Sequence, residues 1–111
     1  MTALLPLQDQ ATLEALLHQE NPVHPMVVIL FSAAWCISCS KINKDRLLQI
    51  HPEIRVYYVD LDEGDGQDML FYVGLSKIPG LLAIYNGSPS APIQTSDNDK
   101  IEAYVKKAFR L

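Results

Sequence analysis

The chain has 111 residues, 49% of them hydrophobic and 20% charged, a balance typical of one globular domain, so we predict a single domain over residues 1–111. Thirteen acidic and nine basic side chains give a net charge of −4, which argues against nucleic-acid binding because that function needs a basic patch. The longest apolar run, around Val27–Phe31, is far too short to span a membrane. The segment Met1–Asp9 lacks basic residues and is interrupted by Pro6, so we expect no secretory signal there.

The first half of the chain predicts a helix, a strand and a second helix. Leucines recur at helical spacing after Asp9, which indicates a helix over about residues 10–19 with Asp9 as its N-cap. The continuous apolar run Met26–Phe31 predicts a strand that is buried on both faces. Residues 36–50 lack Gly and Pro and carry an apolar stripe, so we predict one helix that ends before Pro52.

The second half of the chain adds three strands. The β-branched and aromatic run Ile54–Val59 predicts a central strand, and Leu81–Tyr85 predicts another. Asn86-Gly87 is a strong signal for a hairpin, which returns the chain as an antiparallel edge strand over residues 92–95.

Two further helices complete the predicted fold. Residues 69–73 form one helix, which ends at Gly74. The last helix begins at Ser96, where the residue pattern resembles a capping box and is followed by apolar residues at helical spacing. Strands joined through a helix are parallel, whereas the hairpin is antiparallel. The sequence therefore predicts an α/β domain in which helices flank both faces of a central mixed sheet.

The segment Trp35–Cys39 follows the first predicted strand and holds the only two cysteines of the chain, at Cys36 and Cys39. Two thiols at this spacing suit thiol–disulfide exchange. A helix that begins near Cys36 would favour a thiolate there and lower its pKa, and Cys39 could reach back from the next turn. The alternative is half of a zinc site, but zinc needs four ligands and the chain has no second cysteine pair, so we predict no metal.

The order and spacing of four motifs resemble the thioredoxin family from about Val27 to the last helix. The motifs are Phe31-x-Ala33-x-Trp35-Cys36-x-x-Cys39, Val59-Asp60-x-Asp62, Gly74-x-x-x-Ile78-Pro79 and Tyr85-Asn86-Gly87.

The resemblance implies a thioredoxin fold and a thiol–disulfide oxidoreductase that reduces or exchanges protein disulfides without a cofactor. Cys36 would be the attacking thiol and Cys39 the resolving one. The implied partners are disulfide-containing proteins and an electron donor such as a thioredoxin reductase or glutathione. We expect a cytoplasmic monomer that binds neither nucleic acid nor membranes.

The resemblance also implies a substrate-binding surface around the cysteines. Trp35 and Ile37 would contribute side chains, although Trp35 could instead fill the core. The Ile78–Pro79 bond would be cis and packed beside the cysteines, with the Ile78 backbone pairing with an extended substrate. Gly80, where the family commonly has threonine, would leave this groove roomier.

The sequence departs from the family pattern at the active site. Ile37-Ser38 separates the cysteines in place of Gly-Pro, Leu30 replaces a buried aspartate, and Tyr58 replaces a buried lysine. A buried carboxylate can take the proton of the second cysteine, so we expect resolution by Cys39 to be slower here. The same losses leave a second hypothesis open, a binding or structural subunit with weak or no redox activity.

Overall fold

The computed structural model describes residues 4–111. Met1–Ala3, on which part of the expectation about a secretory signal rests, lie outside the described residues. In chain order the elements are β1 (Leu4–Pro6), α1 (Gln10–Leu17), β2 (Met26–Ser32), the 3₁₀ helix η1 (Ser38–Lys41), α2 (Lys44–Leu48), β3 (Arg55–Asp60), α3 (Gly66–Tyr72), β4 (Gly80–Tyr85), β5 (Ser88–Pro89), β6 (Ile93–Gln94) and α4 (Asn98–Phe109). Among the described residues, no helix has the length and apolar character needed to cross a membrane.

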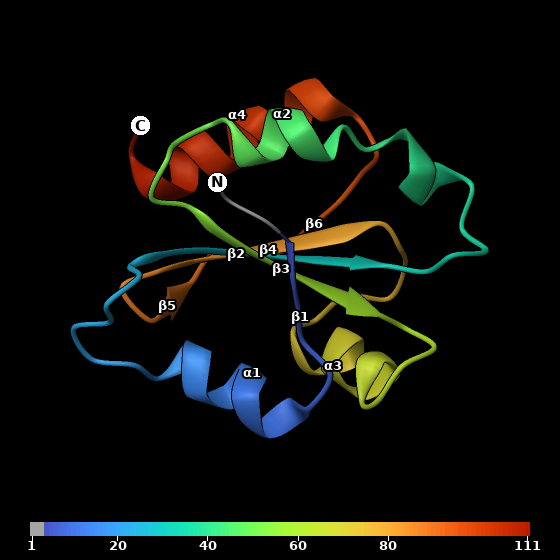
Figure 1. Cartoon of the computed structure of the whole chain (residues 1–111), viewed down its shortest axis with the longest axis horizontal. Coiled ribbons are helices and arrows are strands. Elements are labelled where there is room, and N and C mark those ends of the chain that lie inside the picture. The colour runs from blue at the N-terminus through green and yellow to red at the C-terminus, as the bar shows by residue number, and fades with distance from the viewer. Residues whose placement is uncertain (1–3) are drawn as a thin grey trace.

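The strands form one mixed sheet, as predicted. Its order is β1-β3-β2-β4-β5, with β6 also paired to β4. The central strand β2 runs parallel to β3 and antiparallel to β4. Helices α1 and α3 cover one face of the sheet, and α2 and α4 cover the other (Figure 1). The predicted α/β architecture with helices on both faces is therefore confirmed.

Each face of the sheet buries its own apolar cluster. On the α1/α3 side the cluster includes Phe31 and Met69, and on the α2/α4 side it includes Leu30 and Phe109, all at most 2% exposed. Side chains alternate between the two faces along β2, which explains why this run is apolar throughout.

Two predicted caps are confirmed. The Asp9 carboxylate accepts the Thr12 N–H at 2.8 Å and caps α1. Gly74 follows α3 with a φ of +88°, the left-handed conformation in which glycine ends helices. Helix α3 itself begins at Gly66, earlier than the apolar residues from Met69 indicated.

The return of the hairpin differs from the prediction of one strand over residues 92–95. The predicted turn is present, with positive φ at Asn86 and Gly87, but pairing begins at once in β5 and resumes only in β6. Between them the ladder is interrupted, and the N–H of Ala83 donates to the hydroxyl of Tyr104 on α4 at 3.0 Å. Pro92, which has no N–H group to donate to a ladder, lies within this interruption.

The prediction of one helix over residues 36–50 is wrong, because the segment divides into η1 and α2. At the break, the side-chain amide of Asn98 accepts the N–H of Asn43 at 2.7 Å and donates to the carbonyl of Lys41 at 3.1 Å. Asn43 in turn caps α2 by accepting the N–H of Arg46 at 3.0 Å. Polar groups that a continuous helix would pair internally are thus held by the start of α4.

Candidate active site

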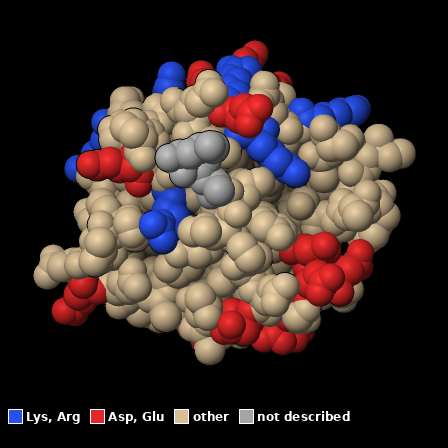
Figure 2. All heavy atoms as spheres, in the orientation of Figure 1, with Lys and Arg blue, Asp and Glu red and all other residues tan. Residues whose placement is uncertain are grey.

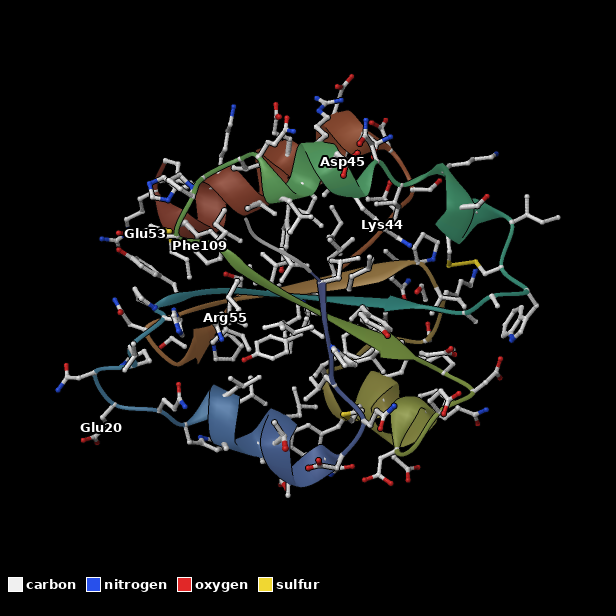
Figure 3. All side chains as sticks on the ribbon, in the orientation of Figure 1. Glu20, Lys44, Asp45, Glu53, Arg55 and Phe109 are labelled. Carbon is white, nitrogen blue, oxygen red and sulfur yellow. A yellow bond between two sulfur atoms is a disulfide. The ribbon has the colours of Figure 1, made fainter. Side chains whose placement is uncertain are left out.

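Cys36 and Cys39 lie just beyond the end of β2 and are joined by a disulfide, with their Cα atoms 5.3 Å apart. Figure 3 shows this bond in yellow at one end of the sheet. The N–H of Cys36 donates to the carbonyl of Ala33 at 3.1 Å, which turns the chain out of the strand. Cys36 is partly exposed and Cys39 is only 6% exposed, so Cys36 is the more accessible of the two.

The helix that was expected to begin at Cys36 begins at Ser38 and is a short 3₁₀ segment. The macrodipole of a long helix therefore does not act on Cys36 as predicted, since the dipole arises from many aligned peptide units. The contact that the structure shows at this sulfur comes from a single backbone group, because the N–H of Cys39 points at the Cys36 sulfur at 3.2 Å.

Trp35 and Ile37 form an apolar rim beside the disulfide. Their side chains are 65% and 79% exposed, so Trp35 does not fill the core. The indole N–H of Trp35 donates to the Asp62 carboxylate at 3.0 Å, and the N–H of Asp62 donates to the Asp60 carboxylate at 2.9 Å. Asp62 belongs to a motif recognised in the sequence but had no predicted role, because only the fold brings it to Trp35.

The segment Ile78–Gly80 reaches the same end of the sheet. Gly80 pairs with Phe31 where β2 leads toward the cysteines, and the Ile78–Pro79 bond is cis, as the family resemblance implies. Pro79 is buried and Ile78 partly buried. The expectation that Gly80 leaves the groove roomier is wrong, because a Cβ there would point into the core and lie 2.7 Å from Leu75.

A groove of about 290 Å³ opens next to Cys39. Its polar lining includes Tyr58 and Asp60 from β3 and Lys44 from α2. The Lys44 side chain extends from the start of α2 toward the sheet (Figure 3). Leu30 lies in the core at 1% exposure and pairs in register with Tyr58, which borders the groove.

Charge is unevenly distributed around the site. In Figure 2, acidic side chains gather over the β3–α3 loop, which contains Asp62, and basic side chains lie mainly over the α2 and α4 layer. The lining of the groove includes one side chain of each sign, Asp60 from β3 and Lys44 from α2. No cluster of His, Cys, Asp or Glu within residues 4–111 has the arrangement of a metal site.

Comparison with known proteins found no matching family model. Among curated proteins, the thioredoxin-like protein CXXS1 of Oryza sativa is 32% identical over 77% of this chain and 63% of that protein. Mitochondrial thioredoxin of Mus musculus is 32% identical over 85% of this chain and 55% of that protein. The chain spans between 44% and 63% of the length of these two relatives and of two mitochondrial thioredoxins of Arabidopsis thaliana.

Solved structures resemble the whole described domain. Oxidised thioredoxin O2 of Arabidopsis thaliana superimposes with a TM-score of 0.77 at 24% identity, covering 96% of this chain and 94% of that one. Oxidised mitochondrial thioredoxin 3 of Saccharomyces cerevisiae gives 0.78 at 20% identity, covering 94% of each chain. The architecture is therefore the thioredoxin fold. Together with the sequence relatives and the bonded Trp35-Cys36-x-x-Cys39 motif, it shows that the chain is a homologue of thioredoxins.

Proposed function

We propose that this protein is a thiol–disulfide oxidoreductase that reduces or exchanges protein disulfides. The observation that carries the proposal is the asymmetry of the bonded pair: Cys36 is accessible beside the exposed Trp35, whereas Cys39 is buried behind it. This arrangement suits a pair in which one sulfur attacks a substrate and the other later releases it.

In the proposed cycle the reduced chain acts in two steps. The Cys36 thiolate attacks one sulfur of the substrate disulfide, forms a mixed disulfide and expels the other substrate sulfur as a thiolate. The Cys39 thiolate then attacks the Cys36 sulfur, forms the Cys36–Cys39 disulfide and expels the second substrate thiolate. Two electrons pass to the substrate, and its two thiolates take up protons from water. A dithiol or two thiols must reduce the chain before the next cycle.

The groove beside Cys39 offers a path for the proton that Cys39 must lose. Leu30 supplies no base, but Cys39 borders the groove together with Asp60 and Lys44. Water that enters the groove accepts the proton. Because no buried carboxylate assists, we expect resolution by Cys39 to be the slower step.

Substrate binding is assigned to the surface that surrounds Cys36. The side chains of Trp35 and Ile37 provide apolar contact, and the backbone of Ile78 and Pro79, just before Gly80 pairs with β2 and β6, is available to an extended peptide. Disulfide-bonded proteins are the proposed substrates, with a thioredoxin reductase or glutathione as donor and no cofactor on this chain.

We propose that the protein is a monomer and that it works in a reducing compartment, because a dithiol pair needs such a compartment to be regenerated. The cytoplasm is our first choice. The mitochondrial relatives make the mitochondrial matrix the other compartment to test.

Reduction of insulin by dithiothreitol, followed by turbidity, tests the activity. The wild-type chain should accelerate the reaction, and Cys36→Ser should abolish the acceleration. Surface variant Lys107→Gln is the matched control and should keep the wild-type rate. If the wild type is no faster than Cys36→Ser, the chain is instead a binding or structural subunit with the thioredoxin fold.

A further inference from the structure

One side-chain oxygen holds the segment that precedes Pro79. Oε1 of Gln94, on β6, accepts the N–H of Ser76 at 2.8 Å, the N–H of Lys77 at 3.0 Å and the hydroxyl of Ser76 at 3.2 Å. Within residues 4–111, neither of these two N–H groups donates to a backbone carbonyl. The Gln94 amide is therefore what organises this irregular stretch between α3 and β4.

Gln94 is well anchored for this task. It pairs in register with Gly80, and its neighbour Ile93 pairs with Leu81, so the β6 backbone is fixed to β4. The bonded residues Ser76 and Lys77 lie immediately before Ile78–Pro79. The side chain thus connects the outer strand to the approach of the proposed substrate edge, forming a bridge between two segments 17 and 18 residues apart in sequence.

We propose that Gln94 is a positioning residue that holds the Ser76–Pro79 backbone ready to pair with an extended protein substrate. The inference rests on the proposed function. A substrate that pairs with the Ile78 backbone binds best when that backbone is already ordered, because ordering it during binding costs free energy. A small disulfide needs only to reach Cys36 and does not use this edge. Gln94 therefore governs selectivity for protein disulfides over small ones.

The experiment compares two disulfides in single-turnover reactions of the pre-reduced chain. Trp35 is the only tryptophan and adjoins Cys36, so its fluorescence follows oxidation without any electron donor. The probes are insulin, which presents an extended peptide, and hydroxyethyl disulfide, which does not. The measured quantity is the ratio of the two bimolecular rate constants.

Four variants separate positioning from general damage. Gln94→Met removes the acceptor at nearly constant size, and Gln94→Asn shortens its reach. Gln94→Glu keeps an oxygen that can accept both N–H groups and should rescue. Gln67→Met is the matched control, because Gln67 is exposed on α3 and makes no side-chain hydrogen bond in the described part of the chain.

We expect Gln94→Met and Gln94→Asn to react with insulin about five- to tenfold more slowly, with rates for hydroxyethyl disulfide within about twofold of wild type. Gln94→Glu and Gln67→Met should keep the wild-type ratio. An unchanged ratio in both removal variants, whether both rates fall together or neither changes, would overturn the role of Gln94. A wild type that reacts with neither disulfide would overturn the proposed function and this inference with it, which is a distinct result.

Discussion

The indole Nε1 of Trp35 donates to the Asp62 carboxylate at 3.0 Å, so the exposed ring beside Cys36 is tied to the loop between β3 and α3. Asp62 is itself held, since its N–H donates to Asp60 at the end of β3. An aromatic ring with 65% exposure would otherwise sample several rotamers. The sheet thereby fixes an apolar surface next to the sulfur that we propose reacts first.

Removing this bond should loosen the ring. We expect Asp62→Ala to lower the fluorescence anisotropy of Trp35 and to slow the reaction with insulin by about two- to fivefold. Asp62→Asn keeps a carbonyl acceptor and should stay near wild type, and Glu63→Ala is the control for loss of a neighbouring charge. If Asp62→Ala and Glu63→Ala behave alike, the charge of the loop matters and the hydrogen bond does not.

The difference in exposure between the two sulfurs predicts the order of reaction. Brief alkylation of the reduced chain near neutral pH should label Cys36 before Cys39, read by peptide mass spectrometry. Cys39→Ser should accumulate a mixed disulfide with substrate, whereas Cys36→Ser should not. Preferential labelling of Cys39 would reverse the assigned roles.

Restoring an aspartate at position 30 should destabilise the protein. Leu30 is 1% exposed in the α2/α4 cluster, where a carboxylate would lose both hydration and the packing of the leucine. We expect Leu30→Asp to cost about 3–5 kcal/mol of unfolding free energy at neutral pH, measured by urea denaturation. Val23→Asp, at a side chain that is 89% exposed, should be nearly neutral. An unchanged midpoint for Leu30→Asp would mean that water reaches this position.

The side chain of Asn98 should stabilise the break between η1 and α2. Asn98→Ala removes the partners of the Asn43 N–H and the Lys41 carbonyl, and we expect it to cost about 1–2 kcal/mol in urea denaturation. Asn98→Asp keeps the acceptor and loses the donor, so it should lie between wild type and Asn98→Ala. Equal losses in the two variants would show that the bond to Lys41 carries the effect.

The ion pairs between α2 and α4 predict a dependence of stability on pH. Arg46 donates to Glu102 at 3.4 Å, and this bond, opposed by partial desolvation, lowers the pKa of the Glu102 carboxyl. A lowered pKa means that the stabilisation is present above the ordinary value of about 4.3 and is lost as the pH falls through the folded value. Arg46→Gln should therefore be less stable than wild type at pH 7 and approach it in acid. For the control Lys107→Gln, the difference in unfolding free energy from wild type should not shrink at low pH. If the difference for Arg46→Gln persists at low pH, lost packing and not the ion pair explains it.

The elements that the sequence predicts well are those whose signal is local. The strand over Met26–Phe31, the turn at Asn86-Gly87 and the cap at Asp9 all follow from residues within a few positions of one another. Strand β1 was missed because three residues that include Pro6 carry little pattern, and only the pairing with β3 makes them a strand.

The same distinction between local and long-range signals holds for the candidate site. The cysteines and Pro79 belong to compact motifs, so they could be identified from the sequence. The break after η1 could not be predicted, because it is held by Asn98, which is 55 residues from Asn43 in sequence. The contacts of Asp62 and Gln94 with the site likewise depend on the tertiary fold. The direction in which a Cβ at position 80 would point, toward Leu75, depends on the backbone geometry of β4, and the residue type alone does not determine it.

Prolines at both outer edges of the sheet bear on self-association. Leu7 turns its N–H inward to Tyr58, so the nitrogen of the adjacent Pro6 in β1 lies on the outward side and offers no donor. Pro89 likewise lacks a donor in β5, at the opposite edge. A second sheet that approaches either edge meets an incomplete row of partners, which is how natural β-proteins avoid edge-to-edge aggregation. Such protection suits a protein whose proposed substrates are extended chains, because prolines at the outer edges make pairing there less favourable than at the proposed binding segment Ile78–Pro79.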